Sequence, residues 1–207
     1  MKSKIFIDMD GVLCDFFGEI SKKAGMSYKK LSVDEFFKVM SREQSVEKFF
    51  LELPEFRTNN VLIKKIIDFA GEYHICTAPL VDPREPIHTK RNVYFARQSI
   101  YGKHAWIQRH LEPQPVTICI AEHKYKEAPA VEDDGTRNIL IDDRKYNTEP
   151  WEKAGGIAIK FQADEHVDDP NLEFIDKELR RVEKELSKSK STYDQVVKSF
   201  IKKYKGD

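Results

Sequence analysis

The sequence lacks the features that mark membrane-spanning, secreted and nucleic-acid-binding proteins. No apolar run approaches the roughly 20 residues that a membrane-spanning helix needs. Its 35 basic residues balance 35 acidic residues, so no overall field favours nucleic acid or an anionic membrane as a partner. A strand-like run begins after only three residues, which predicts that there is no signal peptide. We therefore expect a cytoplasmic protein that binds neither membranes nor nucleic acid.

Cysteines are also few. Cys14, Cys76 and Cys119 lie in or beside apolar runs and show no CxxC spacing, which indicates reduced core residues rather than a disulfide or zinc framework. The hydrophobic content of 40% and the aromatic content of 11% are typical of a folded globule. A length of 207 residues suits one compact α/β domain that carries an insertion.

The chain is organised around residues 4–16, Lys-Ile-Phe-Ile-Asp-Met-Asp-Gly-Val-Leu-Cys-Asp-Phe. The apolar start is typical of a buried strand. It ends at Asp8 and Asp10, which an extended chain directs to the same side, where the two carboxylates repel each other. A bound cation would offset that repulsion; a solvated Asp-x-Asp-Gly turn is the alternative. Open α/β sheets bind ligands at the carboxyl ends of their strands, so we interpret this segment as an active-site strand.

Three further apolar runs are predicted to be strands, and each precedes a polar group: residues 73–76 lead to Thr77, residues 116–120 to Lys124, and residues 138–141 to Asp142 and Asp143. In a parallel sheet with right-handed crossovers, these ends share one edge. Several carboxylates at one edge suit Mg²⁺, which prefers hard oxygen ligands. One aspartate can then attack phosphorus and form an acyl phosphate, while another serves as general acid and base. Thr77 is alternatively a turn former, and Lys124 a surface lysine.

Residues 157–159 are predicted to be a fifth strand, and the remaining segments are predicted to be largely helical. A capping box at Ser32–Glu35 starts one helix of an insertion, and a later helix over residues 91–111 contains Gly102, a potential break. The expected organisation is a core domain, a helical cap and a C-terminal helical extension, over residues 1–16 with 57–170, 17–56, and 171–207 respectively. The C-terminal helices either pack on the core or form a homodimer contact, and the sequence leaves both open.

The segments Asp8–Phe16 and Ile139–Arg144, with Thr77 and the region of Lys124 between them, resemble the haloacid dehalogenase (HAD) superfamily of phosphatases. Within it, the sequence is most similar to the 5'(3')-deoxyribonucleotidase family. The specific cues are Thr-Ala-Pro at 77–79, Lys-His-Ala-Trp at 103–106, and Ile-Leu-Ile-Asp-Asp-Arg-Lys-Tyr-Asn from residue 139. The resemblance spans about residues 4–161. It implies a Rossmann-like parallel α/β sheet with a small helical cap inserted after the first strand.

The same resemblance implies roles for individual residues. Asp8 would be the nucleophile and Asp10 the general acid and base. Mg²⁺ would be held by the Asp8 side chain, the Asp10 backbone carbonyl and Asp143, with Asp142 in or near its coordination shell. The substrate would contact Thr77, Lys124, the backbone of Ala78, Lys103 and, at the nucleobase, Phe16. Phe49 and Phe50 are weaker candidates for that last contact.

The chain departs from the family pattern at Glu122, which stands where the family tends to have an arginine. The segment between Thr77 and Lys103 and the loop from Lys124 to Asp142 are also longer than in compact members of the family. Lys126 offers an alternative to Lys124 for the phosphate contact. We therefore expect a Mg²⁺-dependent phosphomonoesterase, a hydrolase of the 5'-nucleotidase type acting on (deoxy)ribonucleoside monophosphates. The alternatives are a phosphatase for another small phosphate ester, such as a sugar phosphate, and a non-catalytic nucleotide-binding protein.

Overall fold

The computed structural model describes residues 2–43 and 45–188 of the chain. Five parallel strands form one sheet in the order β3-β2-β1-β4-β5. The strands are β1 (Ile5–Ile7), β2 (His74–Thr77), β3 (Ile118–Ile120), β4 (Ile139–Asp142) and β5 (Ile157–Lys160). The chain runs outward from β1 to β3 and then returns to add β4 on the other side of β1. The point where the strand order reverses therefore lies between β1 and β4, where ligands bind in open sheets of this type.

The helices fall into an insertion after β1 and a set that covers the sheet. The insertion holds α1 (Phe16–Ala24), a 3₁₀ turn (Tyr28–Lys30), α2 (Val33–Arg42) and α3 (Val46–Leu51). The others are α4 (Asn59–Ala70), α5 (Lys90–His110), α6 (Lys124–Glu127), α7 (Lys145–Lys153), a 3₁₀ turn (Ala163–His166) and a helix that includes residues 173–188. The predicted fold class, an α/β parallel sheet with a helical insertion after the first strand, is confirmed.

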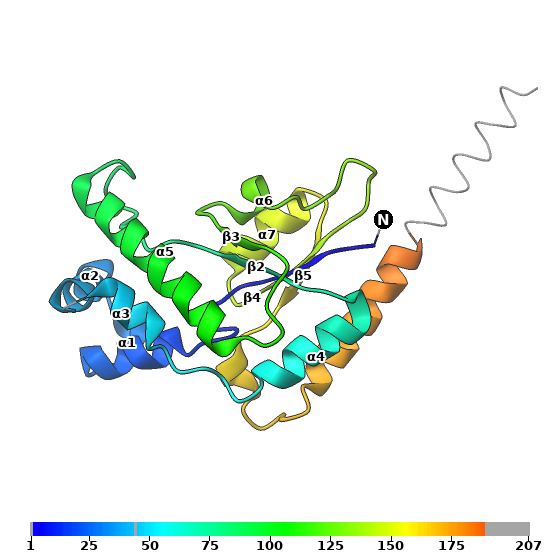
Figure 1. Cartoon of the computed structure of the whole chain (residues 1–207), viewed down its shortest axis with the longest axis horizontal. Helices are drawn as coiled ribbons and strands as arrows, with labels where there is room; N and C mark the ends of the chain where they lie inside the picture. Colours follow the sequence, from blue (N-terminus) through cyan, green and yellow to red (C-terminus); the bar gives the residue numbers. More distant parts are fainter. Residues whose placement is uncertain (1, 44, 189–207) are drawn as a thin grey trace, which may run out of the picture.

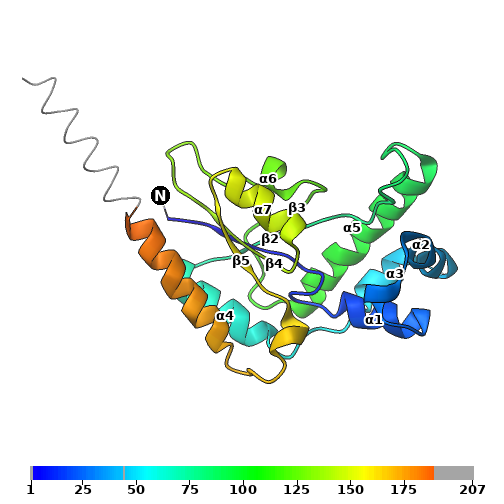
Figure 2. The same cartoon turned by 180° about the vertical axis from the view of Figure 1, so that it is seen from behind.

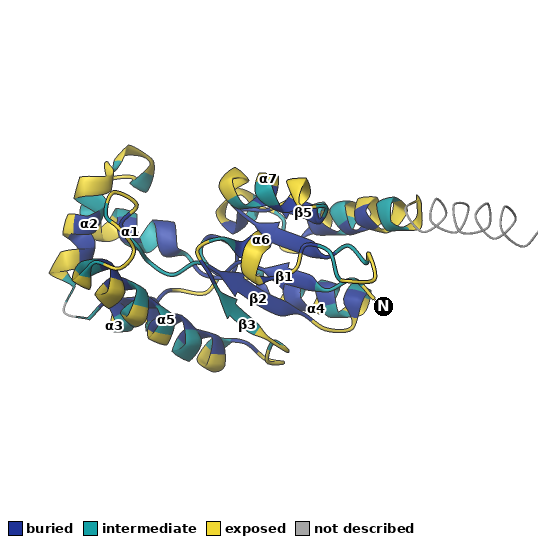
Figure 3. Ribbon diagram, turned by 90° about the horizontal axis from the view of Figure 1, so that it is seen from above, coloured by how far each residue is buried: buried dark blue, intermediate teal, exposed yellow. Residues whose placement is uncertain are grey.

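Alternating residues of β1 divide the core into two sides. Ile5 and Ile7 pack in the larger cluster with α4 and the helix containing residues 173–188, whereas Phe6 packs with Trp151 of α7 on the opposite face. In Figures 1 and 2, α4 and that C-terminal helix lie side by side on the face away from α6 and α7. Figure 3 shows the buried strands between these layers. Both faces of the central strand are therefore apolar, as expected for a parallel strand that is covered on both sides.

The start of the C-terminal segment packs on the core. Leu172, Ile175, Leu179 and Val182 are buried in the larger cluster, and Lys65 of α4 forms an ion pair of 2.6 Å with Asp176. Residues 189–207 lie outside the described residues, so the second half of the predicted C-terminal extension does as well. The domain boundaries and the homodimer contact stay predictions.

Local signals set the helix starts of the insertion. Asp15 caps α1 by accepting a hydrogen bond of 2.8 Å from the Gly18 N–H. Ser32 and Glu35 form the predicted capping box at the start of α2, each side chain accepting from the backbone N–H of the other. These caps satisfy N–H groups that a helix leaves free at its first turn.

The expected break at Gly102 is wrong, because α5 runs without interruption from Lys90 to His110. The glycine is needed for packing between helices. A Cβ atom at this position would lie 2.4 Å from the Glu47 carbonyl oxygen and 2.7 Å from the Phe50 Cβ, both in α3.

The structure agrees with two features of the sequence, the lack of CxxC spacing among its few cysteines and the lack of long apolar runs. Cys14 and Cys76 are buried, Cys119 is half-buried, and all three are free. Within the described ranges, the helices fall short of the length and apolarity that crossing a bilayer requires.

Replacing Gly102 by valine should destabilise the protein by about 1–3 kcal/mol, because the new side chain overlaps backbone of α3. Urea unfolding followed by circular dichroism measures the change. Gln108→Val, at an exposed position of the same helix, is the matched control and should cost only a few tenths of a kcal/mol. Equal stability of the two variants would contradict the packing role of Gly102.

Candidate active site

Three buried carboxylates meet where the strand order reverses. Asp8 directly follows β1, Asp142 ends the neighbouring strand β4, and Asp143 comes next. The pairing of Ile7 with Ile141 aligns the two strand ends. One oxygen of each carboxylate lies within 4.8 Å of the others, so the group could hold a metal ion. Acids more than 130 residues apart in the sequence are thus brought together by a single strand pairing.

The side chain of Asp143 indicates how a cation fits there. It is 7% exposed, and its Oδ1 atom has no hydrogen-bond partner among the described residues. Burial, followed by the charges of Asp8 and Asp142, raises the pKa of Asp143 to about 8. A buried carboxylate oxygen without a donor is costly, and a divalent cation would satisfy it. The carboxylate donors present fit Mg²⁺.

Gly11 lets the loop after β1 pass close to Asp143. Its φ angle is +81°, in the region that favours glycine, and a Cβ atom would lie 2.6 Å from Phe17 Cε2. The same atom would lie 3.2 Å from Cγ of Asp143. The glycine of the Asp-x-Asp-Gly segment therefore serves the site directly.

Lys124 lies between two of the carboxylates. Its buried Nζ atom is 2.7 Å from Asp8 Oδ1 and 2.5 Å from Asp142 Oδ2. Burial opposes the charge on Lys124, but Asp8 and Asp142 outweigh it and raise the pKa of the lysine. Lys126, on the same short helix, is exposed. The structure therefore brings Lys124, rather than Lys126, to the carboxylates.

Asp142 is occupied by protein partners. Besides Lys124, it accepts a hydrogen bond of 2.8 Å from the Arg144 N–H and bonds of 3.1 and 3.0 Å from the Asn147 amide. These contacts leave Asp8 and Asp143 as the carboxylates with oxygens available for a metal. The place of Asp142 in or near a metal shell stays a prediction.

Lys103 connects three of the residues that the sequence predicts in the site. Its fully buried Nζ donates to Asp10 Oδ2 at 2.7 Å, Thr77 Oγ1 at 2.9 Å and the Ala78 carbonyl at 2.7 Å. An ammonium has three N–H donors, and all three are used within the protein. In this structure Lys103 holds Asp10 and the end of β2 together, and its contact with a substrate stays a prediction. Burial raises the pKa of Asp10, Lys103 opposes that rise, and the charge of Asp8 adds to it.

A cavity of about 500 Å³ opens above these groups. Its polar end includes Asp8, Asp10, Lys103, Lys124, Asp143 and Glu122. Its opposite wall is apolar and comes from the insertion and from the loop after β2, with Phe16, Phe17, Tyr28, Phe36, Phe37, Phe50, Leu80 and Val81 among the lining residues. The rings of Phe16 and Phe50 are stacked with centroids 5.8 Å apart. One cavity thus joins a charged end to an aromatic wall.

Comparisons with known proteins give only distant matches. No family model matches the chain, and no curated protein does. Among solved structures, a hydrolase from Streptococcus pneumoniae TIGR4 is similar at 14% identity and a TM-score of 0.43, over 79% of this chain and 95% of its own. A predicted phosphatase from Clostridium acetobutylicum is similar at 14% identity and a TM-score of 0.40, over 85% and 99%. At this level of similarity, the chemistry has to come from the site itself.

Sequence reasoning missed part of the cavity. The part of the wall that the loop after β2 forms was not predicted. Leu80 and Val81 show no periodicity that distinguishes a residue lining a cavity from a residue packed in the core. Asn147 was also missed; its position in the first turn of the helix after Asp142 is the available signal. Phe49, a weaker candidate, is buried against Phe16 and does not line this cavity.

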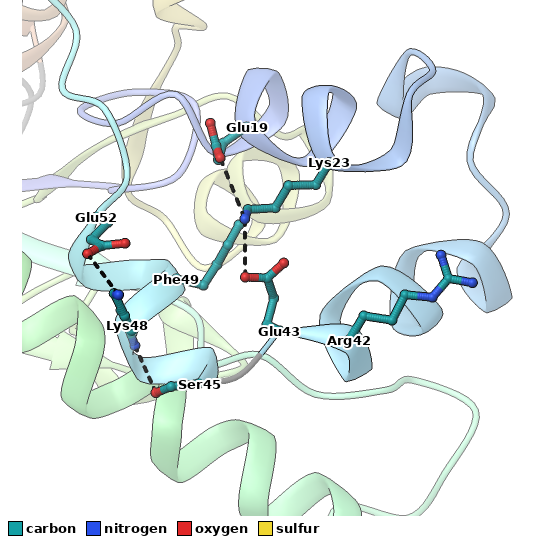
Figure 4. Close-up of a pocket in the computed structure, with 8 residues that line it drawn as sticks. All are labelled: Glu19, Lys23, Arg42, Glu43, Ser45, Lys48, Phe49 and Glu52. Carbon is teal, nitrogen blue, oxygen red and sulfur yellow. Dashed lines mark hydrogen bonds and ion pairs between the residues drawn. The ribbon is translucent and has the colours of Figure 1, made fainter.

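A second hollow of about 270 Å³ lies within the insertion, away from the carboxylates (Figure 4). Lys23 bridges Glu19 and Glu43 there, and Lys48 pairs with Glu52. Its acids are therefore neutralised by neighbouring lysines at the surface, and the hollow offers no chemistry comparable with that of the strand ends.

Binding of Mg²⁺ should release about one proton near neutral pH, because Asp143 is protonated in the metal-free protein below its pKa of about 8. Mg²⁺ affinity should rise with pH and level off above pH 8. Calorimetric titrations in buffers of different ionisation enthalpy, performed below and above that pH, measure both quantities. Asp143→Asn should lose the binding and the proton release, whereas exposed Asp133→Asn should keep both. Undiminished binding by Asp143→Asn would rule out this site.

Proposed function

We propose that the protein is a Mg²⁺-dependent phosphomonoesterase that dephosphorylates nucleoside monophosphates through an aspartyl-phosphate intermediate. The observation that carries this proposal is the placement of Asp8 beside Lys124 and beside the unpartnered oxygen of Asp143. A nucleophilic carboxylate needs a fixed orientation and a positive environment when it approaches an anionic phosphate. Lys124 fixes the orientation of Asp8, and Asp143 offers a place for the cation that would make the environment positive.

In the first half of the reaction, a carboxylate oxygen of Asp8 attacks phosphorus while the bond from phosphorus to the ester oxygen breaks. Asp10 donates its proton to the departing oxygen, so the alcohol leaves neutral. The elevated pKa of Asp10 suits this role, because a general acid has to hold its proton until the transition state. The contact of 2.7 Å with Lys103 then stabilises the carboxylate that remains.

In the second half, the Asp10 carboxylate removes a proton from water. The resulting hydroxide attacks phosphorus, phosphate leaves and the Asp8 carboxylate is restored. Asp10 regains its proton, so the cycle closes without any other reactant. The buried ion pair of Asp8 and Lys124 holds the free carboxylate in one orientation before it attacks.

The side chains of Asp8 and Asp143 and the backbone carbonyl of Asp10 would hold Mg²⁺. When bound, the ion would supply positive charge that reduces the repulsion between the phosphate and Asp8. Thr77, at the end of β2, and Lys124 would bind the other phosphoryl oxygens. Thr77 is fully buried beneath Lys103, so a substrate would reach it only if that hydrogen bond rearranges.

The aromatic wall supports a nucleoside as the leaving group. Phe16, Phe36 and Phe50 lie in the same cavity as the carboxylates, and flat rings are bound well by such surfaces. The small ring of a sugar phosphate would cover less of this wall than a nucleobase would. We therefore favour nucleotides over sugar phosphates as the substrate class.

Phosphate release over a panel of nucleoside monophosphates and sugar phosphates, with and without Mg²⁺, tests the function. We expect Mg²⁺-dependent activity that is highest on nucleotides. Asp8→Asn should reduce kcat by about 10³-fold or more, because an amide is a poor nucleophile. Asp133→Asn, an exposed control, should keep wild-type activity. Full activity of Asp8→Asn would disprove the mechanism, and equal rates on both substrate classes would disprove the specificity.

The two lysines of α6 form a matched pair for a second test. Lys124→Met should lower kcat/KM by about 10²-fold or more, because it leaves Asp8 and Asp142 without their shared cation. Lys126→Met should change kcat/KM less than about twofold, since its side chain is exposed and interacts with the Tyr125 ring. Steady-state kinetics measures both, with thermal unfolding as the control for folding. The opposite order would assign the phosphate lysine to Lys126.

A further inference from the structure

Glu122 is an unusual residue for the cavity that it lines. Its side chain shares the cavity with Asp8 and Asp10 at the polar end, and it is exposed rather than packed. In the part of the chain that the structure describes, no cation or hydrogen-bond donor pairs with its carboxylate. A free carboxylate beside a site for a phosphate dianion weakens anion binding, so its presence there bears on which substrates enter.

The backbone places Glu122 next to the phosphate-binding end of the cavity. The preceding residue, Ala121, donates its N–H to the Thr77 carbonyl oxygen at 2.8 Å. Lys124, two residues later, reaches Asp8. Glu122 therefore lies between two elements that the proposed mechanism assigns to the phosphoryl group. A group attached close to that phosphate would meet its carboxylate.

The cations of the cavity do not neutralise Glu122. Lys103 is engaged by Asp10, and Lys124 by Asp8 and Asp142. Arg144, the remaining lining cation, lies 3.8 Å from Asp143 and over the Phe17 ring. A second anionic group on a substrate would thus face Glu122 without a cation reserved for it.

We propose that Glu122 is a specificity residue that excludes phosphomonoesters whose leaving group carries a second anionic group near the phosphate, and admits those with a neutral hydroxyl there. This inference rests on the proposed function and narrows its substrate class to esters with a single phosphate. Its physical basis is repulsion between like charges: by Coulomb's law, two unit charges about 8 Å apart in a medium of dielectric constant about 20–80 change affinity by about 2- to 30-fold. Selection by repulsion of the wrong substrate is a common source of specificity.

The test compares three ligands of matched shape: a nucleoside 5'-monophosphate, the corresponding 3',5'-bisphosphate, and the analogue whose 3'-phosphate is a neutral dimethyl triester. Dissociation constants are measured by calorimetry in the Asp8→Asn background with Mg²⁺, so that binding is read without turnover. We expect the bisphosphate to bind about 10-fold or more weakly than the other two ligands. Added salt should narrow that gap, because it screens an exposed charge.

Substitutions of Glu122 then test whether this carboxylate causes the weaker binding of the bisphosphate. Glu122→Gln should reduce the difference in affinity by about 3- to 10-fold, and Glu122→Arg should abolish or reverse it. Glu149→Gln, an exposed change on α7 outside the cavity, should leave it unchanged. Thermal unfolding near the wild-type temperature confirms that each variant is folded.

Three results would overturn the inference. The first is a ratio of dissociation constants that stays within twofold of the wild-type ratio in both Glu122→Gln and Glu122→Arg. The others are equally weak binding of the neutral triester and the bisphosphate, and no binding of any of the three ligands. The proposed function is tested separately by phosphate release from the substrate panel. A protein that hydrolyses nucleotides but fails these binding tests would keep its function and lose only the role of Glu122.

Discussion

The buried ion pairs of Lys124 with Asp8 and Asp142 are the constraint on which the site depends. Moving three charged groups out of water carries a large desolvation penalty, and close pairing only partly offsets it. The site therefore needs a rigid frame that keeps these groups in contact. The pairing of β1 with β4 supplies that frame, since Asp8 follows β1, Asp142 ends β4, and the pairing of Ile7 with Ile141 aligns the two strand ends.

The same region carries more negative than positive charge, which distinguishes it from a structural ion-pair network. Asp143 adds a third carboxylate, and one of its oxygens has no partner among the described residues. Asp10 adds a fourth nearby, held by Lys103. The protein thus keeps an electrostatically unfavourable arrangement at one sheet edge, which a divalent cation and a phosphoryl group would together relieve.

In the proposed function, chemistry and selectivity come from different parts of the chain. The strands carry the charged groups, whereas the apolar wall of the cavity comes from the insertion and from the loop after β2. The insertion is held in place where α3 packs closely on α5 at Gly102. Because α5 also carries Lys103, the helix that supports the apolar wall reaches Asp10 as well. Changes in the insertion could therefore alter substrate choice while the strand ends keep their chemistry.

The sequence by itself determined the strands, the polar residues at their ends and the helical insertion. These features follow from local rules: strand period, capping boxes and the tendency of parallel strands to place their ends at one edge. It also singled out Asp8, Asp10, Asp142 and Asp143 as a group, of which the structure brings the carboxylates of Asp8, Asp142 and Asp143 together. It left Lys124 and Lys126 unresolved, and it misread Gly102 as a helix break.

Only the tertiary structure decided those last points, because each depends on contacts between segments far apart in the chain. The choice of Lys124 follows from how α6 sits against β1 and β4, and the need for glycine at position 102 follows from the approach of α3. The three protein partners of Lys103, and the lack of any for Glu122 among the described residues, are likewise invisible in a linear pattern. Residue type sets what a side chain can do, and packing decides which partner it meets.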